Sequence, residues 1–390
     1  MSIPPPAGNP IVLAAIADAV AASPEQAITF AEYMAICLDH PTGGYYRQPA
    51  RRPGRSGDFL TAPEAHPFFG ITLANHVIDA WQRLGTPASF TIREYGSGSG
   101  VLAWDILAGI TDRAPDLAGV LSYELIESNP HRQREADAAF ADAGLGDIVI
   151  THNPATALPP MTGVVLANEL ADALPTHRLR WTGDTFEEGW VTLADGLPHE
   201  VFAPVSAAVA ATDPAGYLAR HGVHLPSGAR IEWSPAAAEW MRAVATGLDR
   251  GYVTVVDYGY PVATLWRDHR LAGTLRAHHA HSVSDNPFAA PGEEDLTAHV
   301  DFTLLQEAGE SAGLTLAGFT TQGAMLASLG LGDHLVRLGQ DPATTAEEYY
   351  AAQASTMRLI DPGGMGRFGV LLMAKNAPVE PPLAALAVTL

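Results

Sequence analysis

Three glycines set two apart, Gly96, Gly98 and Gly100, follow an alternating segment and precede an apolar helical pattern. Such a strand, turn and helix is typical of nucleotide-binding folds, because glycine lets a ligand approach the backbone closely. The dinucleotide fingerprint places its third glycine three positions after the second, whereas here the third comes two positions after it. The turn indicates a ligand against the backbone, and its spacing departs from the dinucleotide pattern.

Two acids beside this turn indicate the charge of the ligand. Glu94 lies two positions before Gly96, where a carboxylate would repel a pyrophosphate and attract a cation. Glu127 comes 31 residues after Gly96 at the end of the next expected strand, where an acid can accept both ribose hydroxyls. S-adenosylmethionine carries a sulfonium and an ammonium but no phosphate. We expect it as the cofactor, with a nicotinamide cofactor as the alternative.

Other expected cofactor contacts come from strand ends and from a loop before the strands. We expect the third strand to end near Asp147 and Ile148, beside the adenine base, and the fourth to end at Asn168. The loop residues Asp58, Phe59 and Thr61 either cover the cofactor or form a turn that caps the next helix. The expected cofactor contacts are Asp58, Phe59, Thr61, Glu94, Gly96, Ser97, Gly98, Gly100, Glu127, Ser128, Asp147, Ile148 and Asn168.

Methyl transfer from a sulfonium needs a nucleophile that offers a lone pair, and two acids follow the fourth expected strand. Glu169 and Asp172 are three residues apart and would share a face if a helix starts there. Carboxylates can orient a guanidinium and favour attack by one nitrogen. We expect these two residues to be catalytic; the alternative is that they are acids at a helix N-terminus, where they are favoured anyway.

A histidine cluster invites a metal interpretation. His278, His279 and His281 lie near Asp285, but no framework of acids and histidines with a defined metal spacing is present. We therefore expect a polar loop and no metal.

Composition limits the partners and the compartment. The chain has 390 residues with 43 acidic and 22 basic side chains, a net charge of −21. Such a surface repels phosphate backbones, so a nucleic-acid substrate is not expected. With Cys37 as its single cysteine and no signal, transit or membrane segment in view, the chain is expected to be cytoplasmic. The expected partners are a protein or small-molecule methyl acceptor and, for a homodimer, a second copy, but no membrane.

Beyond the glycine turn, the chain resembles the MidA-like methyltransferases, a family that includes a mitochondrial complex I assembly factor that methylates arginine. The matching strings, in chain order, are GYYRQ, GDFLTAPE, EYGSGSG, LIESNP, ANELADALP, VVDYG and PGEEDLTAHVDF. The resemblance implies a class I methyltransferase fold and, as the first hypothesis, arginine N-methylation. Small-molecule O- or N-methylation and a non-catalytic assembly role are the alternatives. It also implies a role for Asp295 and His299 in the substrate pocket.

Alternating short strands and helices from residue 89 onward predict an α/β fold, with a seven-stranded, mostly parallel, doubly wound Rossmann-like sheet. We expect a helical segment with a cofactor-covering loop at 1–85 and the core at 86–378. The core is expected to hold an antiparallel β insertion at about 176–230 and a long polar cap loop at about 261–300. A tail at 379–390 is rich in proline and expected to be partly disordered.

Overall fold

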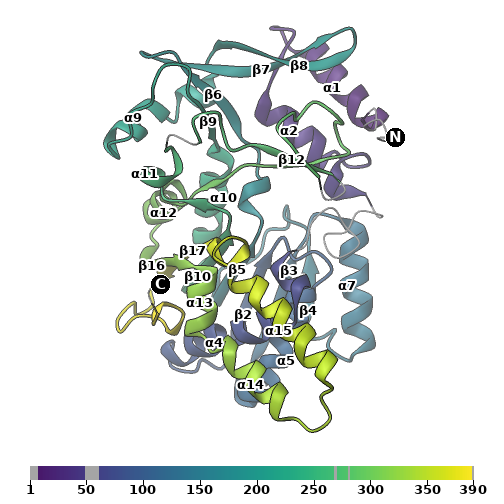
Figure 1. Ribbon diagram of the computed structural model, residues 1–390, viewed down its shortest axis with the longest axis vertical. Helices are drawn as coiled ribbons and strands as arrows, with labels where there is room; N and C mark the ends of the chain where they lie inside the picture. Colours follow the sequence, from purple (N-terminus) through teal and green to yellow (C-terminus); the bar gives the residue numbers. More distant parts are fainter. Residues whose placement is uncertain (1–7, 49–60, 268–269, 280–281, 389–390) are drawn as a thin grey trace.

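The computed structural model describes residues 8–48, 61–267, 270–279 and 282–388, and its centre is a seven-stranded sheet (Figure 1). The sheet order is β16-β17-β10-β5-β2-β3-β4, and only β17 runs antiparallel to its neighbours. The strands are β2 (Phe90–Tyr95), β3 (Leu121–Ile126), β4 (Val149–His152), β5 (Met161–Asn168), β10 (Leu248–Asp257), β16 (Thr315–Thr321) and β17 (Gly369–Lys375). The predicted α/β fold with a mostly parallel sheet is confirmed.

Helices cover both faces of this sheet, which is why its central strands are almost continuously apolar. On one face, α4 (Phe68–Arg83), α5 (Val101–Arg113) and α7 (Pro130–Asp142) share a buried cluster with the strands. On the other face lie α10 (Pro235–Thr246) and α12 (Phe302–Ser311). The strand order reverses between β2 and β5, so the crevice for a ligand opens at their carboxyl ends.

A second, antiparallel sheet lies beyond that end of the core (Figure 1, upper half). Its strands are β1 (Ile28–Thr29), β6 (His177–Trp181), β7 (Phe186–Ala194), β8 (Leu197–Pro204) and β9 (Arg230–Trp233). The helices α1 (Pro10–Ala22) and α2 (Phe30–Asp39) pack against β7 around a shared apolar cluster. Because β1 pairs with β7, the N-terminal segment and the β insertion are one layer over the site.

The segment expected as a polar loop at 261–300 contains a small sheet instead. The strands β12 (Arg276–His279), β13 (Ser282–Ser284) and β14 (Asp295–Thr297) pair antiparallel. The ring of His278 contacts the Thr297 hydroxyl, and that of His279 contacts the Glu293 carbonyl. The short, polar segments of these strands show no alternation of buried and exposed residues that would predict a sheet. His281 lies outside the described residues.

After β16, the chain forms three helices and returns as β17. They are α13 (Gln322–Ser328), α14 (Leu331–Gln340) and α15 (Ala346–Ile360). The described part of the tail beyond them, up to residue 388, packs against the core. Arg83 donates to the carbonyls of Pro381 and Pro382, and the Asp79 carboxylate accepts from the Ala384 amide. The Leu383 side chain is fully buried in the core cluster.

If the tail is part of the core, truncating its anchor must destabilise the fold. We expect Leu383→Ala to lower the free energy of unfolding by about 2–5 kcal/mol, the usual cost for a buried leucine. Urea denaturation followed by circular dichroism measures it. Leu197→Ala is the control, because that side chain is 62% exposed. Equal, small losses in both variants would show that the tail does not pack on the core in solution.

Candidate active site

The glycine turn joins β2 to α5 and forms the floor of the crevice. Gly96, Gly98 and Gly100 have φ values of 70°, 57° and 81°, a left-handed conformation that strongly favours glycine. A Cβ at Gly100 would lie 2.7 Å from the ring of Phe140. The three-glycine spacing is therefore required by the backbone itself, and it leaves the start of α5 open to a ligand.

Glu94 is buried at the end of β2, with its carboxylate against a phenol. The Tyr123 hydroxyl donates to it at 2.5 Å. Burial raises the pKa of Glu94 to about 8; the Tyr123 hydrogen bond opposes this shift and the nearby charge of Glu127 adds to it. A cationic ligand group would favour the ionised form, which fits the ammonium expected there.

Glu127, directly after β3, is fixed by two backbone amides. Gly98 N–H donates to one carboxylate oxygen at 2.8 Å, and Asn129 N–H donates to the other at 2.7 Å. Each oxygen keeps a further lone pair, so the carboxylate can still accept ribose hydroxyls. The Asn129 side chain also donates to the Tyr46 carbonyl, which connects the cofactor loop to the N-terminal segment.

The loop after β5 is held by a single carboxylate. One oxygen of Asp257, at the end of β10, accepts from the backbone amides of Leu170, Ala171 and Asp172 at 2.8–3.3 Å. Glu169 has a φ of 50°, which is uncommon for a residue with a side chain. A short 3-10 turn at Ala171–Ala173 replaces the helix expected for the two acids. Asp257 thus fixes the loop that carries both proposed catalytic residues.

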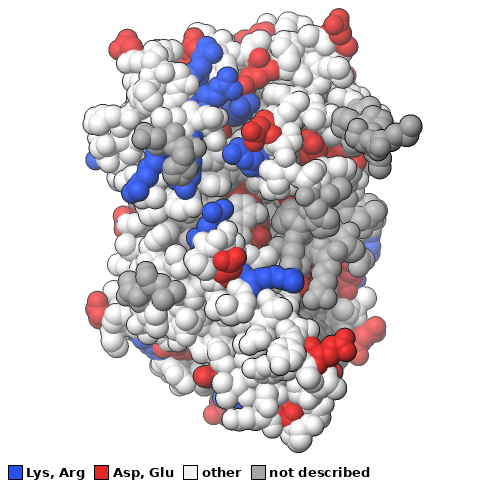
Figure 2. All heavy atoms as spheres, in the orientation of Figure 1, with Lys and Arg blue, Asp and Glu red and all other residues white. Residues whose placement is uncertain are grey.

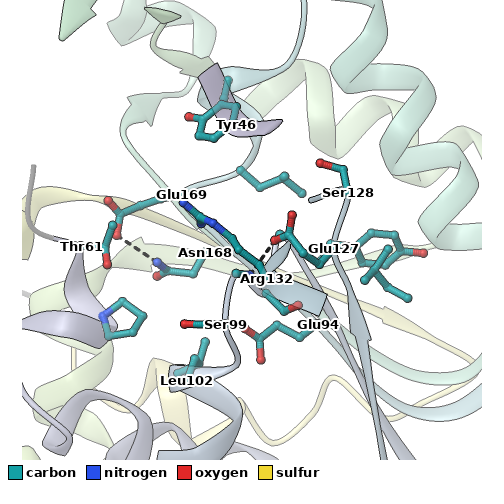
Figure 3. A pocket seen from close by; sticks show the side chains of 18 of the residues that line it. Tyr46, Thr61, Glu94, Ser99, Leu102, Glu127, Ser128, Arg132, Asn168 and Glu169 are labelled. Atoms are coloured by element: carbon teal, nitrogen blue, oxygen red, sulfur yellow. Dashed lines mark hydrogen bonds between the residues drawn. The ribbon is translucent and has the colours of Figure 1, made fainter. Parts of the chain in front are cut away.

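Glu169 points into the crevice beside Asn168 and Thr61 (Figure 3). Its carboxylate accepts from the Ala62 amide at 3.1 Å and from the Asn168 amide group at 2.9 Å. Burial, opposed by these two hydrogen bonds, raises the pKa of Glu169 to about 7. The carboxylate can therefore change protonation near neutral pH.

Asp172 lies deeper, in a group of acids and phenols. Burial raises its pKa, and the nearby charges of Asp257, Asp295 and Glu169 raise it further. The hydroxyl of Tyr46 donates to Asp295 at 2.7 Å. This arrangement concentrates negative charge in a dry part of the site, which is costly unless a cation or protons offset it.

A cavity of about 560 Å³ connects these groups. Four buried polar atoms of its lining residues have no hydrogen-bond partner among the described residues: the Ser97 hydroxyl, the Asn168 side-chain oxygen, Arg47 Nε and Trp240 Nε1. Such atoms usually have partners, so the lining fits a polar ligand such as S-adenosylmethionine. The residues expected from sequence that line the cavity are Thr61, Glu94, Gly96, Ser97, Gly98, Glu127, Ser128, Asn168, Glu169 and Asp172.

The adenine contacts were placed at the wrong end of a strand. Asp147 and Ile148 precede β4 rather than end it. They therefore lie at the amino ends of the parallel strands, whereas the glycine turn lies at the carboxyl ends. The crevice lies at the carboxyl ends of the strands, so the error was to end the strand at Ile148, where β4 is only about to begin. Pro154, just after β4, lines the cavity instead. Asp58 and Phe59 lie outside the described residues, and Gly100 shapes the turn without lining the cavity.

Several lining residues were not predicted as site residues, among them Arg132, Trp240 and Tyr46. Tyr46 belongs to the GYYRQ string, which was the available signal. Arg132 on α7 and Trp240 on α10 are ordinary helix residues in the sequence, and only the packing of the helices brings them to the cavity. From the expected cap at 261–300, no described residue lines the cavity, although Asp295 reaches it through Tyr46.

Comparison with known proteins decides the family. A family model described as "putative S-adenosyl-L-methionine-dependent methyltransferase" matches residues 72–320. The chain belongs to this family. The resemblance seen in the sequence is confirmed, and the protein is an S-adenosylmethionine-dependent methyltransferase.

Relatives of this methyltransferase extend the match over most of the chain. It is 30% identical over 310 residues to the "Protein arginine methyltransferase NDUFAF7 homolog, mitochondrial" of Drosophila melanogaster, covering 73% of this chain and 67% of the relative. It is 27% identical over 386 residues to the Xenopus tropicalis "Protein arginine methyltransferase NDUFAF7, mitochondrial", covering 92% and 85% of the two chains.

A solved structure supports the cofactor. A Burkholderia thailandensis protein crystallised with S-adenosyl-homocysteine superposes on this methyltransferase with a TM-score of 0.84 at 31% identity, covering 100% of this chain and 98% of that one. The predicted cofactor is confirmed. In the described part of the chain, none of the helices is long and apolar enough to cross a membrane.

The raised pKa values of Glu94 and Glu169 predict that cofactor binding releases protons. A sulfonium or ammonium near these carboxyls favours their ionised forms, so groups that are partly protonated near pH 7 lose protons when the cofactor binds. Calorimetry in two buffers of different ionisation enthalpy measures the number released. S-adenosylhomocysteine, which lacks the sulfonium charge, should release fewer. Identical binding enthalpies in both buffers would contradict the carboxyl assignment.

Proposed function

We propose that this methyltransferase transfers methyl groups to arginine side chains of a protein. The observation that supports this proposal best is the group of acids at the inner end of the cavity, beyond Asn168. Glu169 and Asp172 line the cavity there, and Asp257 and Asp295 lie directly behind them. A guanidinium is the cation that matches carboxylates in charge and in planar geometry.

The relatives support the same acceptor. The Drosophila and Xenopus proteins are both named as protein arginine methyltransferases, and the acids come from strings shared with that family. Small-molecule methylation has no comparable observation in its favour. Around Glu169 and Asp172, the described carboxylates favour a cationic acceptor over an anionic one.

The chemistry places specific demands on these residues. Methyl transfer forms a bond from carbon to a guanidinium nitrogen, breaks the carbon–sulfur bond, and leaves a nitrogen that must lose a proton. Glu169, at the end of the parallel strand opposite the glycine turn, can orient that nitrogen and accept the proton. Asp172 can hold the far side of the guanidinium. The left-handed backbone at Glu169 is strain held by the surrounding hydrogen bonds, as is common at active sites.

Removing the Glu169 charge tests this role. We expect Glu169→Gln to reduce methylation of arginine peptides by roughly 10²-fold or more, because the carboxylate acts mainly in the transition state. Cofactor affinity should fall much less than turnover. Transfer of labelled methyl, with calorimetry for binding, separates the two effects.

The matched control is Glu239→Gln, an exposed glutamate on α10, which should methylate at the parent rate. A Glu169→Gln enzyme with normal turnover would show that the carboxylate only shapes the loop. Failure of the parent enzyme to methylate any arginine peptide, while it methylates another acceptor, would overturn the proposed substrate.

A further inference from the structure

Three arginines lie near enough to His299 for their charges to act on its ring. We call Arg270, Arg276 and Arg367 the arginine surface. Burial lowers the pKa of His299 to about 4, and the charges of all three arginines lower it further. The Arg270 guanidinium lies 4.0 Å from the ring centroid of Tyr260, which in turn is 5.9 Å from the His299 ring. The cluster brings together segments from three distant parts of the chain.

Short connections join this cluster to the cavity wall. Tyr258 lines the cavity and is two residues from Tyr260. Its ring packs edge-on against that of Phe368, with the ring centroids 4.7 Å apart, and Phe368 directly follows Arg367. On the other side of the cluster, the Asp172 carbonyl accepts from the amide of Ala298, the residue before His299. The arginine surface therefore borders the wall formed by Asp172 and Tyr258.

These arginines differ from others in the same half of the molecule. Arg178 and Arg180 on β6 are paired with Glu200 and Glu187 at 2.8 and 2.5 Å. Arg367 is exposed and makes no ion pair with any residue that the structure describes. The side chain of Arg276 is 42% exposed, and its partner Asp285, at 3.3 Å, is 85% exposed. Such a solvent-exposed pair contributes little and is easily replaced.

The surface charge of the protein makes this cluster unusual. The chain has a net charge of −21, and Lys and Arg atoms, with Asp and Glu atoms among them, lie over the upper half of the face in Figure 2, where Figure 1 places β6, β9 and β12. The arginines of β6 are the acid-paired ones, so the arginine surface adds positive charge that is not strongly paired. Arg276 begins β12. Positive charge beside an acidic cavity in an acidic protein indicates recognition of a partner with an alternating charge pattern.

We propose that the arginine surface binds acidic side chains that flank the target arginine in the protein substrate. The inference rests on the proposed function, because it takes the target guanidinium to enter the cavity between Glu169 and Asp172. Flanking carboxylates would then lie over Arg276 and Arg367, whose planar groups can bind them with two hydrogen bonds each. If the peptide bound in the opposite orientation, its acidic side chains would face the acids of the cavity, and the repulsion would disfavour that orientation.

A protein segment fits this surface better than a nucleic acid. A phosphate backbone carries charge along its whole length and would be repelled by the remaining acidic surface. An acidic peptide carries its charge at a few positions only, next to a cationic arginine. The pattern of charge in the substrate would therefore match the pattern on the enzyme.

The test uses three synthetic peptides and the protein saturated with S-adenosylhomocysteine. The first has aspartates on both sides of one arginine, the second has asparagines in their place, and the third keeps the aspartates but has lysine as the target. Fluorescence anisotropy gives the affinities. We expect the aspartate peptide to bind about tenfold more tightly than the asparagine peptide at low salt, as two surface ion pairs allow. The advantage should shrink at high salt.

An R276Q/R367Q double variant should lose this tenfold preference while binding the asparagine peptide as before. The control is R250Q, because Arg250 lies at the other end of β10 from the site; this variant should keep the preference. Equal affinity for both peptides in the parent protein, or an unchanged preference in the double variant, would overturn the proposal.

Failure of the proposed function gives a different result. If arginine is not the acceptor, the lysine peptide binds as tightly as the aspartate peptide with arginine and depends on the same two arginines, but no arginine peptide receives labelled methyl from S-adenosylmethionine. The peptide affinities therefore test the arginine surface, and the transfer of labelled methyl tests arginine as the acceptor.

Discussion

The site depends on one buried carboxylate that holds a loop. Asp257 is fully buried, and one of its oxygens accepts from three successive amides while the other accepts from the amide of Tyr258. Successive amides around an anion form a strong binding concavity. This nest sets the direction of the chain after β5 and keeps Glu169 in its left-handed conformation. It also places Asp172 beside Ala298, whose amide donates to the Asp172 carbonyl. Without it, the acids would have no fixed position relative to the glycine turn.

The same region shows why the site is acidic inside. Burial and mutual repulsion raise the pKa of Asp172, and burial raises the pKa of Asp257 to about 7 although its backbone hydrogen bonds oppose that shift. The folded protein therefore holds these carboxyls more readily protonated than the unfolded chain, and their ionisation costs stability as the pH rises toward and past 7. A cation in the cavity offsets that cost. The site is arranged so that its ligand supplies the missing positive charge.

Much of this could be predicted from the sequence because it follows from local rules. The glycine turn and the acids at the ends of β2 and β3 follow a local strand–turn–helix pattern, and Glu94 and Glu127 both line the cavity. The errors arose where tertiary packing decides. Asp147 and Ile148 were assigned to the wrong end of β4. Trp240 reaches the cavity only through helix packing, which no local pattern reveals.

The central claim is that the Asp257 carboxylate positions the acids that orient the acceptor. The direct test is the single-turnover rate of methyl transfer to an arginine peptide by Asp257→Asn, in protein shown to be folded by its thermal unfolding. Asparagine keeps the size but must turn its NH₂ group toward either the three amides or the Tyr258 amide, so donors would face donors. We predict a rate at least 10²-fold below the parent, with cofactor affinity within a few fold. A parent-like rate in a folded variant would contradict the account.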